Sequence, residues 1–241
     1  MKWPKRTRGV RGKAEAPAPS PPTGTLSPEG YRFSNALVML APAAQRPPSI
    51  ALLGDEVVER HLRYGRRALA VCGATERTGV SFIAANLAIA LSQHGVSALL
   101  VDANVRRPSL QSLITPPHET PGLRDYLMNP DMDLAEIVHP DVIPRLSVIF
   151  AGGAASEAAG ELIATEPFRR FVAACLRAYE CTIFDAPPAN RSADARMIGV
   201  AAGYVLLVAR RGASFVDDLS LLTQQLEQDG VSVVGSIFNG A

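Results

Sequence analysis

A nine-residue loop, Gly73 to Ser81, carries the residue types that can hold a phosphate group. It follows an apolar run, leads into a helical pattern, and has the frame of the phosphate-binding sequence G-x-x-x-x-G-K-[ST]. In such a loop, backbone N–H groups and the helix N-terminus surround the phosphate oxygens, while the lysine reaches the β- and γ-phosphates. Val80 stands at the lysine position. The loop therefore keeps its frame and lacks its principal charge.

Two aspartates each end an apolar run and could hold a cation beside this loop. Asp102 closes the run that begins at Ala98, and Asp185 closes the run that begins at Cys181. Carboxylates and a hydroxyl such as that of Ser81 are oxygen ligands of the kind that Mg²⁺ takes. Either carboxylate could also be ordinary polarity at the end of a strand.

Six further segments, in order along the chain, resemble motifs of the bacterial tyrosine kinases, which are MinD/ParA-like P-loop ATPases of capsule and exopolysaccharide systems. The matches include V-D-A-N-V-R-R-P beside their D-x-D-x-R motif, and F-D-A-P-P beside the strand that ends D-[ST]-P-P. The resemblance implies an α/β fold of three layers, with a mostly parallel sheet covered by helices on both faces. It also implies ATP and Mg²⁺ as cofactors. The six segments are residues 98–110, 122–127, 146–153, 181–188, 192–195 and 234–239.

The resemblance also implies roles for individual positions of this sequence. Asp102 and Asp185 match the catalytic carboxylates, and together with Ser81 they match the Mg²⁺ ligands. The positions that match nucleotide contacts are Gly73, Arg77, Thr78, Gly79, Val80, Ser81, Phe82 and Asn239.

Four positions depart from the family pattern. Val80 removes a charge-assisted contact, a kind of interaction worth roughly 1.5–3 kcal/mol. Arg77 stands where the family usually has glycine, so a backbone conformation that favours glycine would have to carry a side chain. Phe82 replaces a hydroxyl-bearing residue, and Asn104 replaces the second aspartate of D-x-D. We expect ATP binding that is weak or lost, although the Arg77 side chain could itself reach a phosphate.

This pattern favours a kinase-like protein with impaired or absent ATP chemistry. The five tyrosines are dispersed, whereas the related kinases carry a tyrosine-rich tail as phosphoacceptor. The expected role is regulatory or scaffolding, in exopolysaccharide biosynthesis and export, with an inner-membrane chain-length or co-polymerase protein as partner. Two alternatives stay open: an active protein-tyrosine autokinase or ATPase, and a MinD-like membrane-positioning module.

The beginning of the chain differs in composition from the rest. Residues 1–13 hold six Lys and Arg residues and no acidic residue, and residues 14–30 are dominated by Pro, Ala and small polar types. Such a composition buries too little apolar area to offset the entropy of ordering. We expect a disordered arm over 1–48, with 31–41 as a short docking segment, and a degenerate P-loop domain over 49–241. The basic cluster fits a solvated tail, contact with an anionic membrane surface, or a binding handle for a partner.

Nearly continuous apolar runs alternate with helical patterns after the loop, which predicts a parallel sheet whose two faces are both covered. A further helix is expected over 56–67. There Arg60 and Arg63 have the arginine spacing of the family's oligomerisation motif E-x-x-R-x-x-R, but Val57 occupies the glutamate place. A homo-oligomer and an ordinary amphipathic surface helix are both open. Strands are expected at 97–101, 146–150, 181–184, 203–209 and 232–237, and helices at 81–93, 156–178, 192–202 and 214–229.

Net charge and cysteine usage restrict the binding partners and the cellular compartment that we expect. A formal net charge of +1 argues against a nucleic-acid binder. The three cysteines have no metal-ligand spacing, so we expect buried reduced thiols and a cytoplasmic protein. The resemblance to the kinases implies a location peripheral to the inner membrane. No run approaches the ~20 apolar residues that cross a bilayer. The four histidines are scattered, which predicts a surface or loop position for each.

Overall fold

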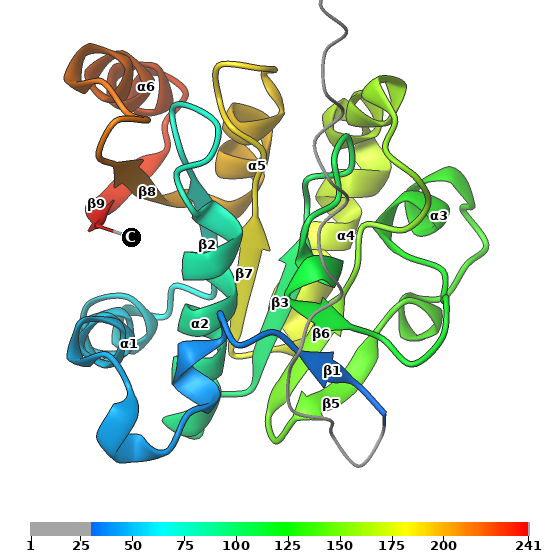
Figure 1. The fold of residues 1–241 in the computed structure, drawn as a ribbon. Coiled ribbons are helices and arrows are strands. Elements are labelled where there is room, and N and C mark those ends of the chain that lie inside the picture. The colour runs from blue at the N-terminus through cyan, green and yellow to red at the C-terminus, as the bar shows by residue number, and fades with distance from the viewer. Residues whose placement is uncertain (1–29, 241) are drawn as a thin grey trace, which may run out of the picture.

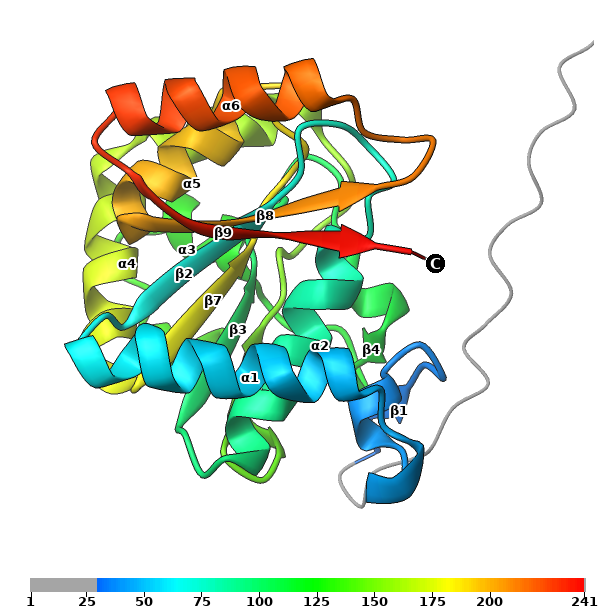
Figure 2. The ribbon, with the colours of Figure 1, turned by 90° about the vertical axis from the view of Figure 1, so that its left-hand side faces the viewer.

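The computed structural model describes residues 30–240, which form a central sheet between two layers of helices (Figures 1 and 2). Seven strands lie in the order β5-β6-β3-β7-β2-β8-β9. All neighbours in this order are parallel except β5 and β6, which pair antiparallel. The strands span Ala68–Cys72 (β2), Ala98–Asp102 (β3), His139–Ile143 (β5), Leu146–Ile149 (β6), Cys181–Asp185 (β7), Tyr204–Arg210 (β8) and Ser232–Asn239 (β9).

Helices cover both faces of the sheet, which confirms the predicted fold class. α1 and α2 lie on one side, and α5 and α6 lie on the other (Figure 2). The buried side chains accordingly form two apolar cores, one with residues of α1 and α2 and the other with residues of α3 to α6. The helices span Pro48–Arg60 (α1), Val80–Gln93 (α2), Leu123–Met128 (α3), Glu166–Ala178 (α4), Asp194–Ala202 (α5) and Val216–Gln228 (α6).

The three central strands are buried along their whole length. Their sequences are ALAVC, ALLVD and CTIFD, and every residue in them is buried. In β2, Leu69 and Val71 join the core beside α2, while the alternate residues join the opposite core. Burying a Leu or Val side chain contributes roughly 1.5–3 kcal/mol. These apolar runs therefore hold the strands from which the polar loops extend.

The helix before β2 lies earlier in the chain than expected. It was predicted over 56–67, whereas α1 begins at Pro48 and is followed by a short 3-10 helix at Leu62–Tyr64. Proline suits a first helical turn, because its φ is already fixed and no N–H partner is needed there. The chain leaves the helix at His61, whose buried ring places Nε2 2.9 Å from the carbonyl oxygen of Ala68.

Two other elements differ from the predicted pattern. The helix expected over 156–178 is a 3-10 helix, Glu157–Ala164, followed by α4. Pro167 lies in the first turn of α4, and its missing N–H prevents one continuous helix. β5 was not predicted; its Pro140 is tolerated because the strand lies at the edge of the sheet.

The segment before α1, which includes the docking segment expected over 31–41, packs against the folded body. Strand β1 (Arg32–Phe33) pairs antiparallel with β4 (Ile114–Thr115). This segment carries the large apolar side chains that the Pro- and Ala-rich part lacks, and they pack into the core beside α2. The basic cluster at 1–13 and the rest of the arm up to residue 29 lie outside the described residues. The buried side chains of the segment are those of Tyr31, Phe33, Leu37 and Met39.

The three cysteines are free and buried, as the sequence predicted. Burial raises the pKa of Cys72, Cys175 and Cys181 to about 12, so these thiols stay protonated and unreactive. Between residues 30 and 240, no helix is both long and apolar enough to span a bilayer.

Candidate functional site

A cavity of about 530 Å³ lies at the carboxyl ends of the central strands. It is bounded by the loops that follow β2, β3 and β7, and ligands of open parallel sheets bind at this edge. The loop predicted to hold phosphate forms one wall through residues 75–82. The facing wall includes Asn104, Arg106, Arg107 and Arg191. The fold therefore brings three separate loops around one opening.

The phosphate loop adopts a conformation that most side chains avoid. Arg77 has φ of 60° and Gly79 has φ of 88°, both in the left-handed region. An arginine there is uncommon, and glycine carries no steric penalty in that region. This agrees with the expectation that the position of Arg77 favours glycine.

Groups from the neighbouring strands hold the loop in this conformation. The guanidinium of Arg210 donates to the carbonyl oxygen of Arg77 at 3.2 Å, and the side-chain amide of Asn239 donates to the carbonyl oxygen of Thr78 at 3.0 Å. The hydroxyl of Thr75 donates to the carbonyl oxygen of Ala213. Asn239, predicted as a nucleotide contact, thus supports the loop from β9.

Two glycines are required by close packing. A Cβ on Gly73 would collide with the hydroxyl of Thr78, and a Cβ on Gly79 would collide with the side-chain amide of Asn239. Gly73 stands one residue before the first glycine of the phosphate-binding pattern, where this chain has the buried Ala74. The loop is therefore close to that pattern and does not match it residue by residue.

Asp102 and Asp185 lie side by side at the ends of β3 and β7, as paired residues of adjacent strands. Both are buried. The carboxylate of Asp102 accepts backbone N–H groups of Asn104, Ser109 and Leu110 at 3.0–3.2 Å. One carboxylate oxygen of Asp185 has no hydrogen-bond partner among residues 30–240. Asp102 therefore shapes the loop after β3, while Asp185 keeps an oxygen available.

The electrostatics of this pair are unfavourable without a cation. Burial raises the pKa of Asp102 to about 6, although its three backbone hydrogen bonds oppose the rise. Burial and the neighbouring Asp102 charge raise the pKa of Asp185 well above its usual range, against the effect of the Ser81 hydroxyl. The unpartnered oxygen, the second carboxylate and this hydroxyl fit a Mg²⁺ ion. Mg²⁺ often takes one or two carboxylates and completes its shell with waters and phosphates.

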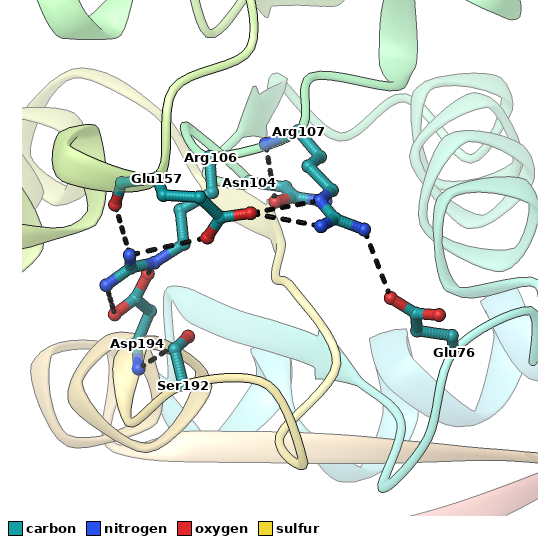
Figure 3. Close-up of polar contacts among 7 residues, drawn as sticks. All are labelled: Glu76, Asn104, Arg106, Arg107, Glu157, Ser192 and Asp194. Carbon is teal, nitrogen blue, oxygen red and sulfur yellow. Dashed lines mark hydrogen bonds and ion pairs between the residues drawn. The ribbon is translucent and has the colours of Figure 1, made fainter.

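Ion pairs connect residues that line the cavity with one another and with Asp194 (Figure 3). The guanidinium of Arg106 makes two hydrogen bonds to the Asp194 carboxylate, at 2.6 and 3.1 Å, and the Asp194 side chain is only 5% exposed. Arg107 lies 3.0 Å from Glu157 and 3.4 Å from Glu76. Each pair joins loops that are far apart in the sequence.

The structure places every predicted site residue in or beside this cleft. Residues 77–82 line it, including Val80 at the lysine position and Phe82. Gly73 and Asn239 support the loop. Asp102 and Asp185 do not line the cavity themselves; they end the strands β3 and β7, whose following loops do. Sequence reasoning missed Glu76, Arg107, Glu157 and Arg191, because their pairing depends on how the loops meet. The matches to D-x-D-x-R and S-D-A already contained Arg106 and Asp194, whose opposite charges were the available signal.

The fold and this site define a P-loop ATPase-like α/β domain. MinD of Pyrococcus horikoshii, solved with Mg-ADP, has the same fold, with a TM-score of 0.59 at 19% identity over 72% of this chain and 70% of that chain. The kinase domain of the Escherichia coli tyrosine kinase Etk is more similar. It has a TM-score of 0.78 at 28% identity and covers 87% of this chain and 81% of that chain.

Sequence comparison leads to the same group of proteins, although no family profile matches the chain. The tyrosine-protein kinase Etk of Escherichia coli K12 is 33% identical over 178 residues, which are 71% of this chain and 23% of Etk. The putative tyrosine-protein kinase EpsB of Ralstonia solanacearum is 30% identical over 175 residues, which are 73% of this chain and 23% of EpsB. The chain belongs to the family of bacterial tyrosine kinase domains, and it spans less than a quarter of the length of these curated relatives.

Proposed function

We propose that this domain is a regulatory or scaffolding component of exopolysaccharide biosynthesis and export, with ATP chemistry that is impaired or absent. The observation that carries the proposal is the loop itself. Val80 lines the cleft at the position where a phosphate-binding loop has its lysine. The relatives named above are tyrosine-protein kinases. The role in exopolysaccharide biosynthesis and export is assigned to this chain as part of the proposal.

The remaining groups can still receive a phosphate and a cation. The N-terminus of α2 points its backbone N–H groups toward the cleft, and Ser81, Asp102 and Asp185 would hold Mg²⁺. When bound, Mg²⁺ supplies positive charge to the phosphates. Val80 supplies none, and one charge-assisted hydrogen bond is worth roughly 1.5–3 kcal/mol. We therefore infer that Mg-ATP binds weakly and is not turned over.

The same proposal places the domain on the cytoplasmic side of the inner membrane. Its partner would be an inner-membrane chain-length or co-polymerase protein, and α1 would supply the surface for that partner or for a second copy of the chain. The basic residues in 1–13 would add contact with anionic lipid. Nucleic acid is not among the proposed partners.

The second candidate is an active tyrosine autokinase or ATPase. The exposed Arg77 favours it, since this side chain lies at the rim of the cleft and could supply charge that Val80 does not. A MinD-like positioning module shares the fold, and a shared fold does not choose among functions.

Titration calorimetry of Mg-ATP into the full chain tests the proposal. We expect a dissociation constant above roughly 1 mM, which means less than about 4 kcal/mol of binding free energy, and no release of phosphate. Val80→Lys alone should not restore hydrolysis, because Arg77, Phe82 and Asn104 remain. Micromolar affinity, or turnover that Asp102→Ala abolishes, would show that the domain is an active enzyme.

A further inference from the structure

Two arginines from different loops meet one carboxylate of the phosphate loop. Glu76 lies 2.8 Å from the guanidinium of Arg191, which follows β7, and 3.4 Å from that of Arg107, which follows β3. All three residues line the cavity. Figure 3 shows Arg107 directed toward Glu76 on one side and Glu157 on the other. Two positive groups thus converge on the loop that lacks a lysine.

A bound anion can replace the Glu76 carboxylate as the partner of Arg107 and Arg191. The side chains of Arg107 and Arg191 are 59% and 56% exposed, and that of Glu76 is 35% exposed. Exposed pairs are weak because water screens the charges. Guanidinium groups bind phosphate oxygens through two parallel N–H donors. A polyphosphate, with several negative charges, is therefore a stronger ligand for both arginines than one carboxylate.

Arg106, in contrast, is not available to bind a new anion. Its guanidinium is held by two hydrogen bonds to Asp194, and its side chain is only 23% exposed. The Asp194 hydrogen bond raises the pKa of Arg106, as expected for a lasting pair. Arg106 therefore fixes the loop after β3 in place, and the exchangeable charges are those of Arg107 and Arg191.

We propose that Arg107 and Arg191 form an anion-binding pair for a polyphosphate group in this cleft, and that Glu76 on the phosphate loop is its internal competitor. This inference rests on the proposed function in one respect, namely that the cleft is a site that binds phosphate weakly. The hydrogen bond from Arg191 lowers the pKa of Glu76, so the competing carboxylate is charged at neutral pH. Glu76 then weakens binding in two ways: it occupies the guanidinium groups, and it repels the phosphate oxygens.

The test titrates inorganic tripolyphosphate and ATP, each with Mg²⁺, into full-length variants. Glu76→Gln should bind both ligands roughly tenfold more tightly than the parent chain, because one added charge-assisted contact is worth about that factor. Adding Arg191→Ala or Arg107→Ala to Glu76→Gln should remove most of the gain. Glu166→Gln is the matched control, since Glu166 pairs with the exposed Arg169 and lies outside the cavity.

Several outcomes would overturn the anion-binding pair. One is unchanged affinity in Glu76→Gln. A second is a gain that persists after both arginines are replaced, since it would reflect net charge alone. A third is a gain for ATP without one for tripolyphosphate, which would place the new contacts on the nucleoside. None of these outcomes contradicts the proposed scaffolding role. Hydrolysis of ATP by the parent chain would contradict that role, but it would not contradict the proposed arginine pair.

Discussion

At the scale of single residues, the burial of a polar side chain depends on residues that are distant in the sequence. His139 was expected at the surface, yet it is buried between the N-terminal segment and the sheet. Its Nδ1 lies 2.8 Å from the hydroxyl of Tyr31, and its Nε2 lies 2.6 Å from the hydroxyl of Thr120. Its ring packs edge-on against Phe150. Burial lowers the pKa of His139, with a smaller contribution from the nearby His118.

The contribution of His139 to stability should therefore fall as the pH drops below neutral, whereas the raised pKa values of Asp102 and Asp185 act in the opposite direction. The folded protein keeps His139 neutral, whereas the unfolded chain takes up a proton below about pH 6.5. This contribution is complete above that pH and is lost on acidification, and the lowered pKa of the buried His61 acts in the same direction. Urea unfolding at pH 7.5 and 5.5 should show a smaller pH effect in His139→Gln than in the parent chain. An equal pH effect in both would contradict the assignment, and His94→Gln serves as the exposed control, because His94 does not contribute to the pKa shift of His139.

At the scale of elements, α2 connects the N-terminal segment to the phosphate loop. Asn86, fully buried in the middle of α2, accepts from the backbone N–H of Met39 at 3.1 Å and donates to the carbonyl oxygen of Ala36 at 3.1 Å. Gln93, at the end of the helix, donates to the carbonyl oxygen of Met39 at 2.8 Å. The helix that begins at the cleft thus also orders the segment before α1.

Asn86→Ala should release that segment. The substitution leaves the buried N–H of Met39 without its partner, which costs roughly 1–3 kcal/mol, and it also removes the hydrogen bonds to the carbonyl oxygens of Ala36 and Phe82. We expect a loss of about 2–4 kcal/mol in the free energy of unfolding, together with faster proteolytic cleavage between residues 30 and 47. Ser92→Ala is the control, because the Ser92 hydroxyl only bonds to Ile89 in its own helix. Unchanged cleavage would mean that apolar packing alone holds the segment.

At the scale of the whole molecule, two separate surfaces are candidates for the one on which function depends. They are the cleft and the outer face of α1. Arg60 at the end of α1 is 79% exposed and pairs with Glu56, and Arg63 in the 3-10 helix that follows is 67% exposed and pairs with Glu59 of α1. Exposed pairs of this kind contribute little to folding. These charges can therefore be changed without loss of the fold, and they form a surface that a partner could contact.

If the domain acts as a scaffold, the two regions should differ in their tolerance of mutation. We expect a Ser81→Ala, Asp102→Asn double variant to restore polymer production in a deletion strain. Arg60→Glu with Arg63→Glu should fail to restore it while the protein stays soluble, as shown by circular dichroism and gel filtration. The opposite result would show that nucleotide chemistry persists and that the charges on α1 are dispensable.

The sequence by itself determined the sheet and the position of the cleft. Short apolar runs that alternate with helical patterns predict strands covered on both faces, and the polar loops then lie at the ends of these strands. Asp102 and Asp185 follow such runs, so their meeting at one edge was predictable. The glycine that the family has at the position of Arg77 agrees with the positive φ found there.

The tertiary structure alone decided which charges face one another and where the folded body begins. Glu76, Arg107 and Arg191 lie on three loops, and no spacing in the sequence relates them. The sequence predicted a docking segment over 31–41 within the arm, but not its partners, and α2 and β4 supply the groups that pair with it. His61 and His139 were misplaced for the same reason. Burial of a lone polar residue depends on partners brought by the fold, and those partners leave no periodic pattern in the sequence.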